Sequence, residues 1–154
     1  MWKRSVGIAA GLVTLLAGCA ETSVMDVNAN TVMVTASADP SCGQIGAKEV
    51  AVRRAAYETL KRGYDRYIIV ETAAQDNTRV EDGLPVTIET TTKGNRTETI
   101  IDGGDSIIGG THDQENVIKM FRLSDPGADK AVDARRVLGP DWQNVLSKAP
   151  SDVC

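Results

Sequence analysis

Residues 31–70 read TVMVTASADPSCGQIGAKEVAVRRAAYETLKRGYDRYIIV, and the spacing of the apolar residues changes twice along this stretch. Residues 31–38 alternate between apolar and polar side chains, as a strand with one buried face does. Residues 46 to 61 or 62 have good helix propensity, and Gly63 follows where a helix C-cap belongs. The apolar run at residues 67–70 predicts a short strand buried on both faces. This stretch predicts a strand–helix–strand unit, whose crossover would be right-handed if its two strands pair in parallel.

A hairpin is expected further along the chain, at residues 85–101. Gly94-Asn95 suits a two-residue type II′ turn, and the resulting register gives one face to the core and the other to solvent. The face assigned to the core carries Val86, Ile88, Thr90, Thr92, Thr97, Thr99 and Ile101.

The remaining segments complete the prediction of an α+β fold. The sequence predicts loops at residues 73–83 and 102–110, a strand at residues 116–123, and helices at residues 128–138 and 141–148. We therefore expect a small sheet of four or five strands with helices packed on one face, in a single domain over residues 31–154.

The N-terminal residues 1–19, MWKRSVGIAAGLVTLLAGC, have the three parts of a secretory signal. Lys3 and Arg4 supply the positive start, an apolar run follows, and small residues precede Cys19. The apolar run covers residues 6–16, which is shorter than the roughly 20 residues that a membrane-spanning helix needs. The pattern indicates export rather than a transmembrane segment.

Residues 16–19, LAGC, resemble the lipobox of bacterial lipoproteins. The resemblance implies that residues 1–18 are removed as a signal peptide and that Cys19 is acylated. Two or more acyl chains, such as palmitate, anchor stably because each buried methylene contributes about 0.8 kcal/mol. Ala20 rather than Asp follows the cysteine, which resembles the default for sorting to the outer membrane. We expect a lipoprotein in the outer membrane that faces the periplasm, with residues 19–30 as a tether; the alternatives are an uncleaved anchor and a secreted protein without lipid.

The composition excludes some classes of partner. The chain has 154 residues, of which 17 are basic, 21 are acidic and 4% are aromatic. Lys3 and Arg4 are two of the basic residues, so a chain that starts at Cys19 has 15 basic against 21 acidic residues and a formal net charge of −6. An acidic surface is repelled by nucleic acid and by an anionic bilayer, so we expect no nucleic-acid partner. The lipid, rather than surface charge, would hold the protein at the membrane.

Two cysteines remain once Cys19 is assigned to lipid. They are Cys42 and Cys154, and the periplasm is an oxidising compartment. We expect a disulfide between them. The alternative is a reactive thiol at Cys42, where the nearby helix N-terminus would favour the thiolate.

Residues 102–115 suggest an alternative function, a small periplasmic metal-binding protein or hydrolase. His112 could bind a metal or polarise a nucleophile, although a single histidine in a loop is more often solvated. Carboxylates among glycines could supply oxygen ligands for Ca²⁺, although their spacing does not match an EF-hand. These carboxylates belong to Asp102, Asp105, Asp113 and Glu115. We assign no catalytic residue, metal ligand or cofactor, because the sequence holds neither a Ser-His-Asp set nor a redox CxxC motif.

Three features occur together in this chain: the lipobox, a helix closing on Gly63-Tyr64 before an aromatic-aliphatic strand (GYDRYIIV), and a C-terminal LGPDW segment followed by a terminal cysteine. Together they resemble a family of small proteobacterial lipoproteins of unknown function, and the resemblance covers most of the mature chain. It implies an envelope lipoprotein and carries over no activity, cofactor or catalytic residue. We expect a non-enzymatic lipoprotein that binds a protein or peptidoglycan partner or has a structural role, with the oligomeric state left open.

Overall fold

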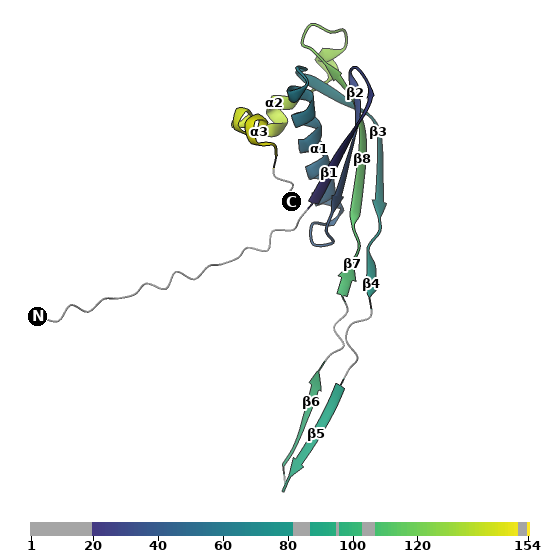
Figure 1. Cartoon of the computed structure of the whole chain (residues 1–154), viewed down its shortest axis with the longest axis vertical. Helices are drawn as coiled ribbons and strands as arrows, with labels where there is room; N and C mark the ends of the chain where they lie inside the picture. The colour runs from purple at the N-terminus through teal and green to yellow at the C-terminus, as the bar shows by residue number, and fades with distance from the viewer. Residues whose placement is uncertain (1–19, 82–86, 95, 103–106, 151–153) are drawn as a thin grey trace, which may run out of the picture.

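The computed structural model describes residues 20–81, 87–94, 96–102, 107–150 and 154. Its centre is a five-stranded antiparallel sheet in the order β1-β2-β8-β3-β9, with helices packed on one face (Figure 1). This arrangement confirms the predicted α+β fold. The strands of the sheet are β1 (Ala20–Asn28), β2 (Thr31–Ala38), β3 (Arg66–Asp76), β8 (His112–Phe121) and β9 (Val132–Asp133). The helices are α1 (Gly43–Lys61), the 3-10 helix η1 (Ala128–Lys130), α2 (Ala134–Leu138) and α3 (Trp142–Lys148).

The predicted strand–helix–strand unit is present as β2, α1 and β3, but its two strands do not pair with each other. Strand β8 lies between them and pairs antiparallel with both. β2 and β3 therefore run in the same direction with one strand separating them. The sequence between residues 31 and 70 could not show this, because the inserted strand begins at residue 112.

The core lies between α1 and one face of the sheet. Ala47, Ala51 and Ala55 are fully buried in α1, and their small side chains let the helix approach the strands closely. Alternate residues of the strands meet the helix, among them Val34 of β2 and Ile118 of β8, both fully buried. The main cluster of buried side chains comprises Val32, Val34, Ala55, Ala56, Tyr67, Ile118, Met120, Ala134 and Leu138.

Residues 20–28 form strand β1, so the predicted tether over residues 19–30 is wrong for this part of the chain. β1 pairs with β2 along nearly all of its length. It also contacts the helix layer, because Nη2 of Arg62 lies 2.7 Å from Oδ1 of Asp26. The polar composition concealed a strand period in which every second side chain is half-buried at the start of β1. An edge strand needs only that one-sided pattern.

Strand β3 also differs from its prediction. Ile69 and Val70 are 40% and 56% exposed, so the strand is not buried on both faces. The helices in the described part of the chain cover one face of the sheet, and none of them packs on the other face, which we call the open face (Figure 1). The strand continues to Asp76, and β4 (Arg79–Glu81) follows it, so the loop predicted at residues 73–83 is wrong over those residues.

The C-terminal third contains shorter elements than expected. The single helix predicted at residues 128–138 is divided into η1, β9 and α2. The division occurs because Asp133 is an extended residue that caps α2: its Oδ1 accepts from the backbone N–H of Arg135 at 2.9 Å and of Arg136 at 3.3 Å. Strand β8 begins at His112, earlier than the strand predicted from residue 116.

The predicted hairpin is present as β5 (Thr87–Lys93) and β6 (Arg96–Asp102). Lys93 pairs with Arg96 across Gly94-Asn95, which confirms the two-residue connection, and Gly94 has the positive φ of 62° that such a turn requires. The prediction that one face belongs to the core is wrong. Thr90, Thr92 and Thr99, all assigned to that face, are exposed.

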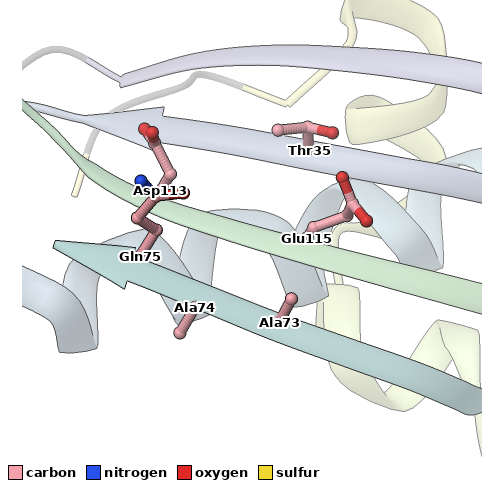
Figure 2. Close-up of a pocket in the computed structure, with 6 residues that line it drawn as sticks. All are labelled: Thr35, Ala73, Ala74, Gln75, Asp113 and Glu115. Atoms are coloured by element: carbon pink, nitrogen blue, oxygen red, sulfur yellow. The ribbon is translucent and has the colours of Figure 1, made fainter. Parts of the chain in front are cut away.

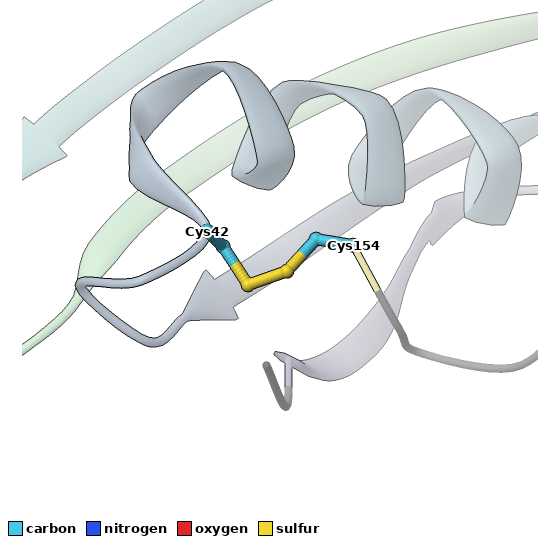
Figure 3. Close-up of a disulfide and its surroundings, with 2 residues drawn as sticks. All are labelled: Cys42 and Cys154. Carbon is cyan, nitrogen blue, oxygen red and sulfur yellow. A yellow bond between two sulfur atoms is a disulfide. The ribbon is translucent and has the colours of Figure 1, made fainter. Parts of the chain in front are cut away.

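The predicted disulfide joins Cys42, just before α1, to Cys154 at the end of the chain (Figure 3). The two Cα atoms are 5.7 Å apart and 112 positions apart in sequence. Gly46 lies beneath the bridge. A Cβ added there would lie 2.9 Å from Cβ of Cys42 and 3.0 Å from Cβ of Cys154. The first turn of α1 therefore has room for the disulfide because residue 46 has no side chain.

We expect Gly46→Ala to destabilise the oxidised protein by about 1–3 kcal/mol, because the added methyl group overpacks the disulfide. Reduction frees the Cys154 side chain, so the loss should be smaller in the reduced protein. Urea unfolding with and without reductant measures both values. Gly43→Ala is the control: its added Cβ meets nothing within 4 Å, so its backbone strain at φ +64° should cost the same in both states. Equal losses for Gly46→Ala in both states would contradict the expectation.

Tyr67 predicts a pH dependence of stability. Its side chain is almost fully buried, and burial raises the pKa of the Tyr67 phenol from 10.0 to about 12. The folded protein therefore retains a proton that the unfolded chain loses. The free energy of unfolding should fall by on the order of 2 kcal/mol as pH rises between these two pKa values. Urea unfolding across that range measures the fall, and Tyr67→Phe should lack it. The same fall in Tyr67→Phe would assign it to another group.

Candidate functional site

The residues singled out from the sequence do not form one site. Cys19 lies outside the described residues, so the proposed lipid attachment rests on the sequence pattern. Cys42 and Cys154 are joined in the disulfide, which excludes a reactive thiol at Cys42 in this oxidised form. Asp105 also lies outside the described residues, and Asp102 is the last residue of β6.

His112 is the first residue of β8 and contacts the end of β3. Its Nδ1 lies 3.5 Å from Oδ1 of Asp76, and its side chain is mostly buried. Asp76 is engaged in a local turn, where it accepts from Thr78 Oγ1 at 2.6 Å and from Thr78 N at 2.9 Å. These hydrogen bonds, and to a smaller extent the nearby histidine, lower the pKa of Asp76. Asp76 is therefore positioned to hold His112 at the end of the sheet. No described contact places a nucleophile against His112.

Asp113 and Glu115 lie on the open face of the sheet, where they border a shallow depression of about 240 Å³ (Figure 2). Thr35, Ala73, Ala74 and Gln75 complete its lining. Both carboxylate oxygens of Asp113 are already engaged: Oδ1 accepts from Ser37 Oγ at 2.6 Å, and Oδ2 accepts from Asn77 Nδ2 at 2.6 Å. Within the described residues, no three His, Cys, Asp or Glu side chains come close enough to hold a metal ion. The segment 102–115 is thus not one binding loop, because its members are distributed over β6 and β8.

The most distinctive feature of the molecule is a two-stranded extension beyond the sheet, which we call the arm and define by its described residues, 77–81, 87–94, 96–102 and 107–111. Its strands pair antiparallel as β4 with β7 (Ile107–Gly109) and β5 with β6. Figure 1 shows the arm continuing from the ends of β3 and β8, past the end of the helix layer. In the described part of the chain, neither pair adds a third strand.

The root of the arm is fixed to the sheet. Asn77 N donates to Thr111 O at 2.9 Å, which continues the pairing of β3 with β8. The Asn77 side chain donates to Asp113 and accepts from Gln75 Nε2 at 2.8 Å. Gly110 adopts φ +101°, and an added Cβ would lie 2.9 Å from Cα of Thr78. Hydrogen bonds and close backbone contact therefore set the direction in which the arm leaves the sheet.

The arm presents apolar side chains and backbone edges to solvent. Val80 and Ile108 face each other in register and are 70% and 61% exposed. Towards the tip, Thr90 and Thr99 are opposite each other, and both are exposed. The sequence predicts this hairpin but does not predict that it extends beyond the sheet. One available signal was the number of threonines on the supposed core face, which are Thr90, Thr92, Thr97 and Thr99 among its seven residues.

Comparison with protein-family models, with curated proteins and with solved structures finds no match to this chain. None of the helices in the described part of the chain combines the length and the apolarity that crossing a bilayer requires. The functional argument therefore depends on the chain's own residues.

Proposed function

We propose that this protein is a non-enzymatic lipoprotein of the cell envelope, held in the outer membrane through Cys19 and facing the periplasm, and that it binds a protein partner through the arm. The lipobox at residues 16–19 supports the anchor. The arm is the single observation that supports binding. It also favours a protein over peptidoglycan, because the arm offers unpaired strand edges and few aromatic platforms.

An isolated two-stranded hairpin is at best marginally stable in water. Sheet edges are usually blunted or covered, because unpaired backbone N–H and C=O groups invite another strand. The arm instead extends into solvent with β-branched residues along both of its ladders, such as Val80 and Ile108 or Thr90 and Thr99. A partner segment that adds as a further strand would satisfy the free backbone groups, and alternate side chains would supply specificity.

Deletion of the arm tests this function. Replacing residues 78–110 by Asn-Gly joins Asn77 to Thr111, between which the N–H···O bond already exists. We expect the shortened protein to keep the unfolding free energy of the sheet domain and to lose its partner. The measurement is affinity purification of both lipidated forms from cross-linked cells. Equal recovery of the same proteins with and without the arm would contradict the proposal.

Two controls separate the anchor from the arm. Cys19→Ser should abolish metabolic labelling with a fatty-acid analogue and release the protein from membranes, while the folded domain still unfolds with the same midpoint. Sedimentation with purified peptidoglycan tests the cell-wall alternative. If the arm is needed for sedimentation with peptidoglycan, and no protein is captured in an arm-dependent way, the partner is the cell wall rather than a protein.

A further inference from the structure

The open face of the sheet carries a row of apolar side chains, which we call the apolar row and define as Met25, Met33 and Val117. Register aligns these residues side by side across the neighbouring strands β1, β2 and β8. Side chains alternate between the two faces of a strand, and the next residues along β2 and β8, Val34 and Ile118, are fully buried on the helix side. Met25 is 55% exposed, and the other two members of the row are partly exposed. The apolar row is therefore a surface that another layer can cover.

Side chains of opposite charge lie on the two sides of the apolar row. On strand β8, Glu115 lies two residues before Val117 and Lys119 two residues after it, so all three side chains share the open face. The Lys119 ammonium lies 5.6 Å from the centre of the Phe121 ring. Among the described residues, neither Glu115 nor Lys119 forms an ion pair. Strand β8 thus presents an acidic, an apolar and a basic side chain in succession.

This order of charges is complementary to itself. Consider two copies of the sheet packed face to face, with a two-fold axis that runs along the apolar row between them. Such an axis reverses the strand direction, so each residue of the row lies over its own copy. Residues two positions before the row then lie over residues two positions after it. Glu115 of each chain therefore meets Lys119 of the other chain, and the pair forms twice.

The surface around Glu115 has room for an incoming lysine side chain. Register places Thr35 and Ala73 on either side of Glu115. These three residues line the shallow depression of about 240 Å³ on the open face (Figure 2). Their short side chains leave the Glu115 carboxylate accessible, and the methylene groups of Lys119 from a second chain would pack over Ala73 while its ammonium reaches the carboxylate.

The open face is large enough for a specific contact between two chains. At about 3.4 Å per residue, β8 spans roughly 27 Å between Asp113 and Phe121, and four strands about 4.8 Å apart are roughly 19 Å wide. Two such faces together cover on the order of 1,000 Å², the area at which specific interfaces begin. Sheets that pack face to face keep their strands nearly aligned, as this arrangement requires.

The alternation of charge favours a second copy over other occupants. An anionic bilayer would attract Lys119 and repel Glu115, and a uniformly basic protein segment would do the reverse. A second copy satisfies both charges with one symmetric contact. Its one unfavourable feature is Glu71, which lies opposite Val117 on β3 and so extends the apolar row towards a like charge on the other chain.

We infer that the open face is the contact surface of a symmetric dimer, in which the apolar rows of two chains stack and Glu115 of each chain pairs with Lys119 of the other. The inference does not depend on the arm or on the anchor, because every residue it uses belongs to the five-stranded sheet.

Multi-angle light scattering of the oxidised full-length protein in detergent, with the detergent mass subtracted, tests the dimer. We expect the mass of two chains for the wild type. Glu115→Lys would oppose two lysines and Lys119→Glu would oppose two carboxylates, so either change should raise the dimer dissociation constant by about tenfold or more. Glu115→Lys combined with Lys119→Glu restores both pairs and should restore the dimer. Glu71→Gln removes a like-charge contact and should tighten it.

Glu49→Lys is the matched control for charge reversal, because Glu49 is exposed on α1, away from the open face. It should leave the dimer unchanged, and the urea midpoint of each variant shows whether its fold is intact. A monomeric wild type would overturn the inference. So would a dimer that is indifferent to Glu115→Lys, or a double variant that stays monomeric while unfolding at the wild-type midpoint.

Cross-linking locates the axis. The chain has three cysteines, two of which form the disulfide, so in a chain that carries Cys19→Ser the change Val117→Cys adds a single free thiol. Facing sheets lie about 10 Å apart, so a bifunctional thiol reagent of that length or less should join two chains through residue 117. Leu123→Cys is the control, because Leu123 is 62% exposed and lies six positions from the axis. Cross-linking that is equal at the two positions would overturn the inference.

Discussion

Replacement of Cys154 by serine is expected to lower the free energy of unfolding of the oxidised protein by about 4 kcal/mol. The disulfide closes a loop with a sequence separation of 112, so it removes a large part of the conformational freedom of the unfolded chain. It also holds the end of the chain against the first turn of α1 (Figure 3). Urea unfolding of the wild type and the variant measures the difference.

Reductant provides the internal control for this prediction. Wild-type protein in dithiothreitol should unfold at the urea midpoint of Cys154→Ser, and the variant itself should not respond to dithiothreitol. Cys42→Ser should behave like Cys154→Ser, and the double variant should be no less stable than either single variant. Additive losses in the double variant would mean that the cysteines act separately rather than through one bond.

Replacement of Ile118 by alanine is expected to cost about 3–4 kcal/mol of unfolding free energy. Ile118 is fully buried on the central strand β8, opposite Val32 on one side and Ile69 on the other. Alanine would leave a cavity between the sheet and α1 that the packed alanines of the helix are too short to fill. Denaturant unfolding at constant m-value measures the loss.

Ile108→Ala is the matched control, since it is the same substitution in a strand. Ile108 is 61% exposed on the arm, so the change should lie within about 0.5 kcal/mol. The same variant should weaken partner capture if the exposed pair with Val80 lies in the interface. A loss at Ile108 comparable to that at Ile118 would mean that the arm is packed in solution, and would contradict its role as a free binding element.

Local sequence patterns predict the structure correctly where residues a few positions apart determine it. The helix predicted from residue 46 extends over Gly43–Lys61, and the hairpin has the predicted two-residue turn at Gly94-Asn95. Both depend on short-range properties: helix propensity in one case, and the positive φ that glycine tolerates in the other. The disulfide followed from the small number of cysteines rather than from any contact.

Features that depend on long-range packing differ from the predictions made from the sequence. The sequence predicts a tether where strand β1 forms, because the polar residues of β1 conceal a one-sided strand period. The apolar run at residues 67–70 predicts a strand buried on both faces, because the run itself does not show which face of the sheet the helices cover. The acidic residues of segment 102–115 suggest a loop of metal ligands. In the structure Asp113 and Glu115 belong to strand β8 instead.

The sequence by itself determined several covalent and local features that the structure describes: the pairing of Cys42 with Cys154, the helix after residue 42 and the two-residue turn of the hairpin. These depend on residue chemistry or on neighbours a few positions apart. Only the tertiary structure decided that β8 enters between β2 and β3, that the described helices cover one face of the sheet, and that the hairpin leaves the sheet as an arm. Ile108 and Ile118 show the physical reason. Both are strand isoleucines, and their burial depends on whether a distant helix covers them.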